Sequence, residues 1–103
     1  MFIAITAGQA SLQDPANFRA FKIVSDGVKD DLAALRAALA GWASVDEDGH
    51  AWVSPAHLRA DPSVAADPAW QQGFDAMIDK ARPHGWVHPQ TGAIRAHIEW
   101  SVP

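Results

Sequence analysis

The sequence contains neither cysteine nor tyrosine. Without cysteine the chain has no disulfide, no thiolate nucleophile and no cysteine-based metal site. Basic residues are few, with 8 Lys and Arg against 12 Asp and Glu. The resulting net charge of −4 argues against nucleic-acid binding, which requires a field of positive charge. The apolar run at residues 2–5 is too short for a membrane span or a signal peptide, so we expect no membrane association and a cytoplasmic location.

Diagnostic motifs for catalysis or cofactor binding are also missing, so the sequence leaves open whether the protein is an enzyme. No serine lies in a Gly-x-Ser-x-Gly elbow, and the glycines form neither a phosphate-binding loop nor a dinucleotide fingerprint. We therefore expect no cofactor. His84 and His88 are four residues apart, but the prolines and glycine around them disfavour a helix, and no His-Glu-x-x-His pattern occurs. The sequence thus predicts no metal site.

A hydrophobic content of 49% over 103 residues is typical of one folded domain, spanning 1–103. Five of the residues are tryptophan, an unusual number for so short a chain. Each has a large side chain whose N–H needs a partner when buried. Some of them are therefore expected to line a pocket or an interface rather than the core.

The first half of the chain predicts a strand at residues 2–7, followed by helix. Asp14-Pro15 is typical of a helix start, and apolar residues then recur at spacings of three and four as far as Leu39. Ser25-Asp26-Gly27 interrupts this stripe, so residues 14–40 form either one kinked helix or two. The part from Val28 to Ala40 has the strongest helical character.

Two hairpins and two further helices are predicted after Gly41. Short apolar runs on either side of the acidic turn 46–49 indicate a hairpin, and Ser54-Pro55 then begins a short helix to about Arg59. A second cap-proline pair, Asp67-Pro68, begins an amphipathic helix that ends before Pro83. Gly73 inside this helix suggests that another backbone passes close by. Residues 85–88, the turn 89–92 and the strand 93–100 form the second hairpin.

A helix, a Gly-Trp pair and a hairpin thus occur twice, at residues 28–53 and 68–100. The alternative is a coincidence between two common helix-to-hairpin junctions. Either way we expect an α+β fold. It would have a small, mainly antiparallel sheet of about five strands, with two principal helices packed on one face.

The second hairpin carries the candidate site. If the turn is 89–92, five alternating side chains share one face of the sheet: Trp86, His88, Arg95, His97 and Glu99. We assign acid–base catalysis to His88, His97 and Glu99, and ligand binding to Arg95, Trp86 and Trp52. The alternative is that these residues are the solvated side of a two-faced sheet.

Two functions follow from this pattern. The first is a small ligand-binding protein or cofactor-free enzyme, in which the histidines act on an apolar or aromatic organic acid held by Arg95. The second is a non-catalytic interaction or assembly module whose tryptophans mediate contacts. The aromatic content and the few charges at the sheet edges also predict a homodimer.

Overall fold

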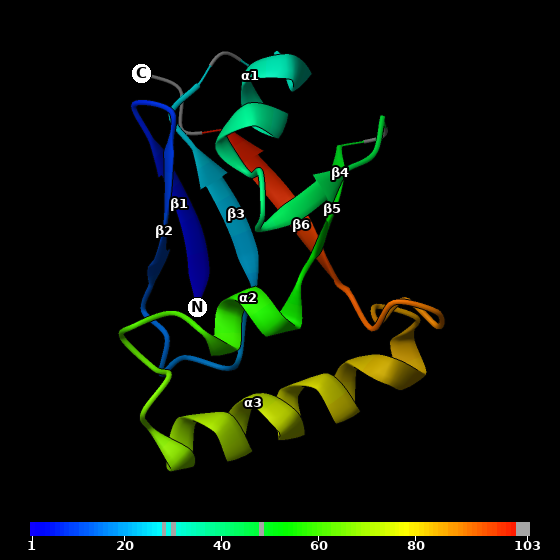
Figure 1. Cartoon of the computed structure of the whole chain (residues 1–103). Coiled ribbons are helices and arrows are strands. Elements are labelled where there is room, and N and C mark those ends of the chain that lie inside the picture. Colours follow the sequence, from blue (N-terminus) through cyan, green and yellow to red (C-terminus); the bar gives the residue numbers. More distant parts are fainter. Residues whose placement is uncertain (28, 30, 48, 101–103) are drawn as a thin grey trace.

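The computed structural model describes residues 1–27, 29, 31–47 and 49–100. This part of the chain forms six strands, three α-helices and one 3-10 turn (Figure 1). The strands are β1 (Phe2–Thr6), β2 (Gln9–Gln13), β3 (Lys22–Ser25), β4 (Ala43–Val45), β5 (His50–Val53) and β6 (Ile94–Trp100). The helices are α1 (Leu32–Ala38), α2 (Pro55–Arg59) and α3 (Pro68–Ala81), followed by the 3-10 turn η1 (Arg82–His84).

The strands form one mixed sheet in the order β2-β1-β3-β6-β5-β4. The outer pairs β1–β2, β5–β6 and β4–β5 are antiparallel, whereas β3 pairs in parallel with both β1 and β6. The fold is therefore α+β, as predicted. A mainly antiparallel sheet of about five strands was predicted. The sheet has six strands, and its pairing is antiparallel on either side of β3 but parallel at β3 itself.

The helix predicted to begin at Asp14-Pro15 is wrong. Asp14 has a φ of 48°, in the left-handed region, and residues 14–21 form a loop that leads into β3. Phe18 and Val24 belong to the predicted helical stripe, but they pack in unrelated places. Phe18 contacts the Trp70 ring on α3, and Val24 lies in the centre of the sheet, between β1 and β6. The described part of residues 14–40 therefore holds one helix, α1.

Capping side chains set the starts of the helices. Asp31 Oδ1 accepts a hydrogen bond from the Ala34 N–H and begins α1, while Val28, where we expected the start, lies outside the described residues. Ser54 and Asp67 cap α2 and α3 in the same way, and both helices have proline at their first position. Such caps contribute about 1 kcal/mol each. The predictions for α2, α3 and the β4–β5 hairpin are confirmed.

Strand β2 was not predicted. Ala7 and Gly8, with φ values of 52° and 78°, form the two-residue turn that joins it to β1. Two consecutive residues with positive φ are typical of a tight hairpin turn whose twist matches that of the strands. β2 therefore lies antiparallel to β1, with Thr6 opposite Gln9 and Phe2 opposite Gln13.

One face of the sheet forms the core. Along β1, β3, β5 and β6 the buried side chains alternate with more exposed ones, and the buried set is continuous with that of the helices. The helices supply Leu35, Leu58, Phe74 and Ile78 to this cluster. The other face, called the open face below, has no helix over it among the described elements. Its side chains include Trp52, Arg95, His97 and Glu99, which β5 and β6 direct away from the core.

The two copies of the helix–Gly-Trp–hairpin unit are both present, but they differ. Gly41 and Gly85 both have positive φ values, 84° and 75°, so each lets the chain turn sharply after its helix. The first copy continues into the paired strands β4 and β5. In the second copy only Val87 bridges to Ile94, so the returning strand β6 has a short partner.

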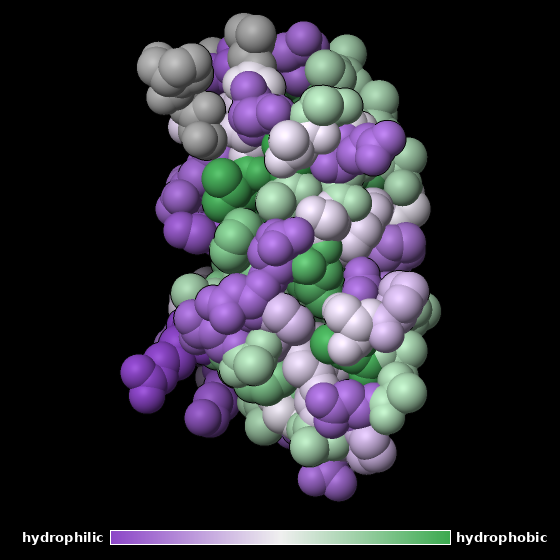
Figure 2. All heavy atoms as spheres, turned by 90° about the vertical axis from the view of Figure 1, so that its left-hand side faces the viewer, coloured by the Kyte–Doolittle hydropathy of each residue, from purple (hydrophilic) through white to green (hydrophobic). Residues whose placement is uncertain are grey.

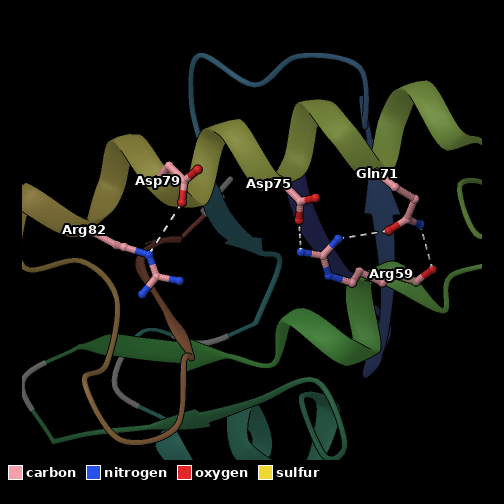
Figure 3. Close-up of polar contacts among 5 residues, drawn as sticks. All are labelled: Arg59, Gln71, Asp75, Asp79 and Arg82. Atoms are coloured by element: carbon pink, nitrogen blue, oxygen red, sulfur yellow. Dashed lines mark hydrogen bonds and ion pairs between the residues drawn. The ribbon is translucent and has the colours of Figure 1, made fainter.

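Hydrogen bonds join both the loop at residues 14–21 and helix α2 to α3. The Trp70 indole N–H donates to the Pro15 carbonyl at 2.7 Å, and its ring stacks on Phe74. The Arg59 guanidinium donates to Gln71 Oε1 at 3.1 Å and to the Asp75 carboxylate (Figure 3). Gln71 in turn donates to the Arg59 carbonyl. These contacts hold the loop at residues 14–21 and helix α2 against the first half of α3.

Helices long and apolar enough to cross a bilayer are absent from the described residues.

Candidate functional site

Arg95 lies between two tryptophans on the open face. It is directly opposite Trp52 on β5, and its N–H donates to the Trp86 carbonyl at 2.7 Å on its other side. Trp86 is held by stacking on His84, with ring centroids 4.4 Å apart and planes 20° from parallel. Trp86 is 48% exposed. The Arg95 side chain therefore lies between aromatic side chains on the open face, which is the face that the alternation along β6 predicted for it.

The next row of the open face contains two histidines. His97 lies directly opposite His50 on β5 and opposite Lys22 on β3, and the imidazole centroids of His50 and His97 are 6.2 Å apart. His97 is exposed, as is Arg95 two residues before it. Along a strand, residues two apart are about 7 Å from each other on the same face. His97 and Arg95 can therefore contact one ligand together.

Glu99 lies one row further and already has a partner. Its carboxylate accepts a hydrogen bond from Lys22 Nζ at 3.1 Å, and both side chains are about half exposed. The pair joins β3 to β6 across the open face. The structure therefore places Glu99 in a cross-strand ion pair on the same face as Arg95 and His97 but away from the hollows described below.

His88 belongs to the turn of the second hairpin. Its Nδ1 accepts hydrogen bonds from the N–H groups of Gln90 and Thr91, at 3.1 and 3.3 Å. Nδ1 is therefore engaged with the backbone of the turn. The His88 ring meets Trp52 edge to face, at 5.2 Å between centroids. The structure thus groups His88 with Trp52 and separates it from His97.

Two hollows flank Trp86 and Arg95. The first, called the Phe18 hollow, has a volume of about 450 Å³ and lies between the loop at residues 18–21, the end of α3 and the start of β6. Its lining is Phe18, Arg19, Ala20, Phe21, Met77, Lys80, Ala81, His84, Trp86, Ile94 and Arg95. The second, called the His97 hollow, has a volume of about 310 Å³ and is lined by Phe21, His50, Trp86, Arg95 and His97. Phe21, Trp86 and Arg95 line both.

The charges around these hollows all have one sign. Arg19, Lys80 and Arg95 are the charged residues in the two linings, and no Asp or Glu is among the described lining residues. None of the three makes an ion pair with another described residue. In a protein of net charge −4, such a concentration of unpaired cations is a local feature. It raises the local concentration of anions and offers donors for one.

A third hollow, of about 540 Å³, lies on the other side of Trp52. Trp42, Trp52, His88 and Thr91 contribute to it, together with small residues from β4, α2 and the second turn. None of its described lining residues is an acid, a lysine or an arginine. Trp52 and His88, predicted as site residues, therefore lie at this uncharged hollow, whereas Trp86, Arg95 and His97 lie at the cationic ones.

Several lining residues were not predicted. Phe18, Arg19 and Phe21 were assigned to a helix, and Lys80 belongs to α3 rather than to the second hairpin. The loop at residues 18–21 is brought to Trp86 by the fold, so no local spacing marks its side chains. The closest signal was the number of tryptophans, some of which were expected to line a pocket or an interface.

Among the described residues, no group of three or more His, Asp or Glu side chains is placed to hold a metal ion. Comparisons with protein-family models, with curated proteins and with solved structures found no match to this chain. The site is therefore interpreted from its own geometry.

Proposed function

We propose that the Phe18 and His97 hollows bind an apolar or aromatic organic acid. The observation that carries this proposal is their lining, in which aromatic side chains are accompanied by cations and by no described acid. Binding sites for small molecules are typically apolar hollows of about 300–1,000 Å³ with a few polar groups that fix the orientation. Both hollows fall within this range.

Each group has a role in this proposal. Arg95 binds the carboxylate, because the planar guanidinium donates two parallel hydrogen bonds to it. Phe21 and Trp86 contact the apolar body of the ligand. Any acid–base step would fall to His97 with His50 beside it, since Nδ1 of His88 already accepts two hydrogen bonds in a turn.

Tryptophan fluorescence tests the proposal directly. Benzoate, phenylacetate and 2-naphthoate should each change the emission saturably, whereas benzamide, which lacks the charge, should bind far more weakly. Arg95→Gln should weaken benzoate binding by about tenfold or more, since a hydrogen bond to a charged group contributes about 1.5–3 kcal/mol. His97→Ala should also reduce the response. Arg82→Gln is the matched control, because Arg82 is exposed and lines neither hollow. Equal binding of benzamide and benzoate, or equal losses in the two arginine variants, would contradict the proposal.

The alternative function is a non-catalytic interaction module. One observation favours it: Trp86 is a large apolar side chain that is 48% exposed, and tryptophan is enriched where protein surfaces meet. In this case no carboxylate would alter the fluorescence, and Trp86→Ala would change the size of an assembly instead. Light scattering of wild type and Trp86→Ala, beside the carboxylate titration, separates the two functions.

A further inference from the structure

We infer that strand β2 pairs with β2 of a second copy of this chain, in an antiparallel dimer centred on Ser11. This inference is independent of the proposed ligand site, which lies around β6 and the end of α3. It rests on the exposure of β2 at the sheet edge, on the absence of the usual edge protection, and on the symmetry of the strand.

β2 is a regular strand at the edge of the sheet. All five of its residues pair with β1, and β1 is its only neighbour in the described sheet. An edge strand presents unpaired N–H and C=O groups along its free side, which can form hydrogen bonds with another strand. In Figure 2, which views the side of the molecule where β2 lies in Figure 1, hydrophobic residues reach the surface between hydrophilic ones.

The two edges of the sheet differ in their protection. At the opposite edge, β4 has three residues and leads into the acidic turn that begins Asp46-Glu47. Short length and charge both discourage pairing between edges. β2 has five residues, Gln-Ala-Ser-Leu-Gln, with no charge and no proline. Of the two edges, β2 is therefore the one open to another strand.

The sequence of β2 is nearly the same in both directions. In an antiparallel pair about Ser11, Gln9 of one copy lies opposite Gln13 of the other, and Ala10 lies opposite Leu12. On the open face, the side-chain amide of Gln9 in one copy lies beside that of Gln13 in the other. On the core face, the small side chain of Ala10 in one copy lies beside the larger Leu12 of the other. A twofold dimer requires such self-complementarity, because each copy contributes the same surface.

In this register, apolar side chains of the two copies contact each other on the core face. Leu12 lies opposite Ile3 and Ala10 opposite Ile5, so both belong to the core side of the sheet. Both are only partly buried and pack against the edge of the core. In the dimer, Leu12 of each copy covers Ala10 of the other, so that the apolar layer continues across the axis. This match between Leu12 and Ala10 across the axis favours a second copy of the chain over an unrelated peptide as the partner of β2.

Sedimentation velocity from low micromolar to millimolar concentration tests the dimer. The wild-type protein should show a reversible monomer–dimer equilibrium. Ser11→Lys places two lysines opposite each other at the axis and should weaken the dimer by about tenfold or more, since opposed like charges cost up to several kcal/mol. Ser44→Lys is the matched control, since Ser44 is at the centre of β4 and is also exposed, and it should leave the equilibrium unchanged. Benzoate binding by Ser11→Lys should equal that of wild type.

Crosslinking tests the register. The chain has no cysteine, so Ser11→Cys introduces a single thiol that would face its equivalent across the axis. Mild oxidation should give a disulfide-linked dimer of Ser11→Cys and much less of Ser44→Cys. A wild-type chain that remains monomeric at millimolar concentration would overturn the inference. So would equal crosslinking of the two cysteine variants, or a dimer that Trp86→Ala disrupts and Ser11→Lys does not.

Discussion

Gly73 and Phe18 approach so closely that a methyl group on Gly73 would lie 2.6 Å from Cε2 of Phe18. The contact is between a helix backbone on α3 and an aromatic ring from the loop at residues 14–21. The sequence predicted a close approach at this glycine, although by a backbone rather than by a ring. Because Phe18 also contacts Trp70 and lines the Phe18 hollow, Gly73 leaves the space that one wall of the candidate site occupies.

Gly73→Ala should therefore have different effects on stability in two backgrounds. In a helix interior, alanine is favoured over glycine by about 1 kcal/mol. In the wild-type chain, displacement of the Phe18 ring should cancel this gain or exceed it, because overpacking costs about 1–3 kcal/mol. In Phe18→Ala, which removes the ring, the same change should stabilise by about 1 kcal/mol. Urea unfolding of the four proteins measures both effects. Equal changes in the two backgrounds would show that the ring does not constrain Gly73.

Arg59 should contribute more to stability than Arg82, which lies at the other end of α3 (Figure 3). The Arg59 guanidinium bonds to Gln71 and Asp75 and lies 4.8 Å from the centroid of the Phe74 ring. Arg82 makes one ion pair with Asp79, at 3.7 Å, between two well-exposed side chains. Arg59→Ala should lower the free energy of unfolding by about 1–2 kcal/mol, and Arg82→Ala by under about 0.5 kcal/mol. Similar losses in thermal or urea unfolding would contradict this difference.

We expect His88 to stabilise the turn of the second hairpin and to make no contact with the ligand. Because Nδ1 accepts hydrogen bonds from two backbone N–H groups, His88→Asn should preserve the turn, since an asparagine oxygen accepts in the same way. His88→Ala should lower the free energy of unfolding by about 1 kcal/mol. Both variants should bind benzoate as wild type does, because His88 lies at neither cationic hollow. A loss of benzoate binding in His88→Asn would instead place His88 at the ligand site.

Much of the fold could be predicted from local chemistry. Ser54-Pro55 and Asp67-Pro68 mark the starts of α2 and α3 because capping depends only on neighbouring residues. The alternation along β6 correctly indicates which of its side chains are buried. β3 could not be found in this way, since Lys22–Ser25 is too short to show alternation and its apolar residues fit a helical stripe equally well.

The candidate site was predictable only in part. Trp86, Arg95 and His97 lie on the predicted face because strand periodicity determines it. The remaining walls come from Phe18 and Phe21 on a loop and from Lys80 on a helix, which tertiary packing brings to β6. The distribution of charge around the hollows likewise depends on where those segments lie. A sequence pattern therefore predicted the face on which the candidate site lies, but neither the hollows nor their cationic character.

Chemical-shift mapping with 2-naphthoate tests the central proposal most directly. In two-dimensional NMR spectra, saturable shifts should cluster at Phe18, Phe21, Trp86, Ile94 and Arg95, including the indole N–H of Trp86. The neutral 2-naphthamide should cause little change under the same conditions. Shifts centred on Trp42 and Trp52, or no saturable shifts with either compound, would contradict binding of an organic acid at Arg95.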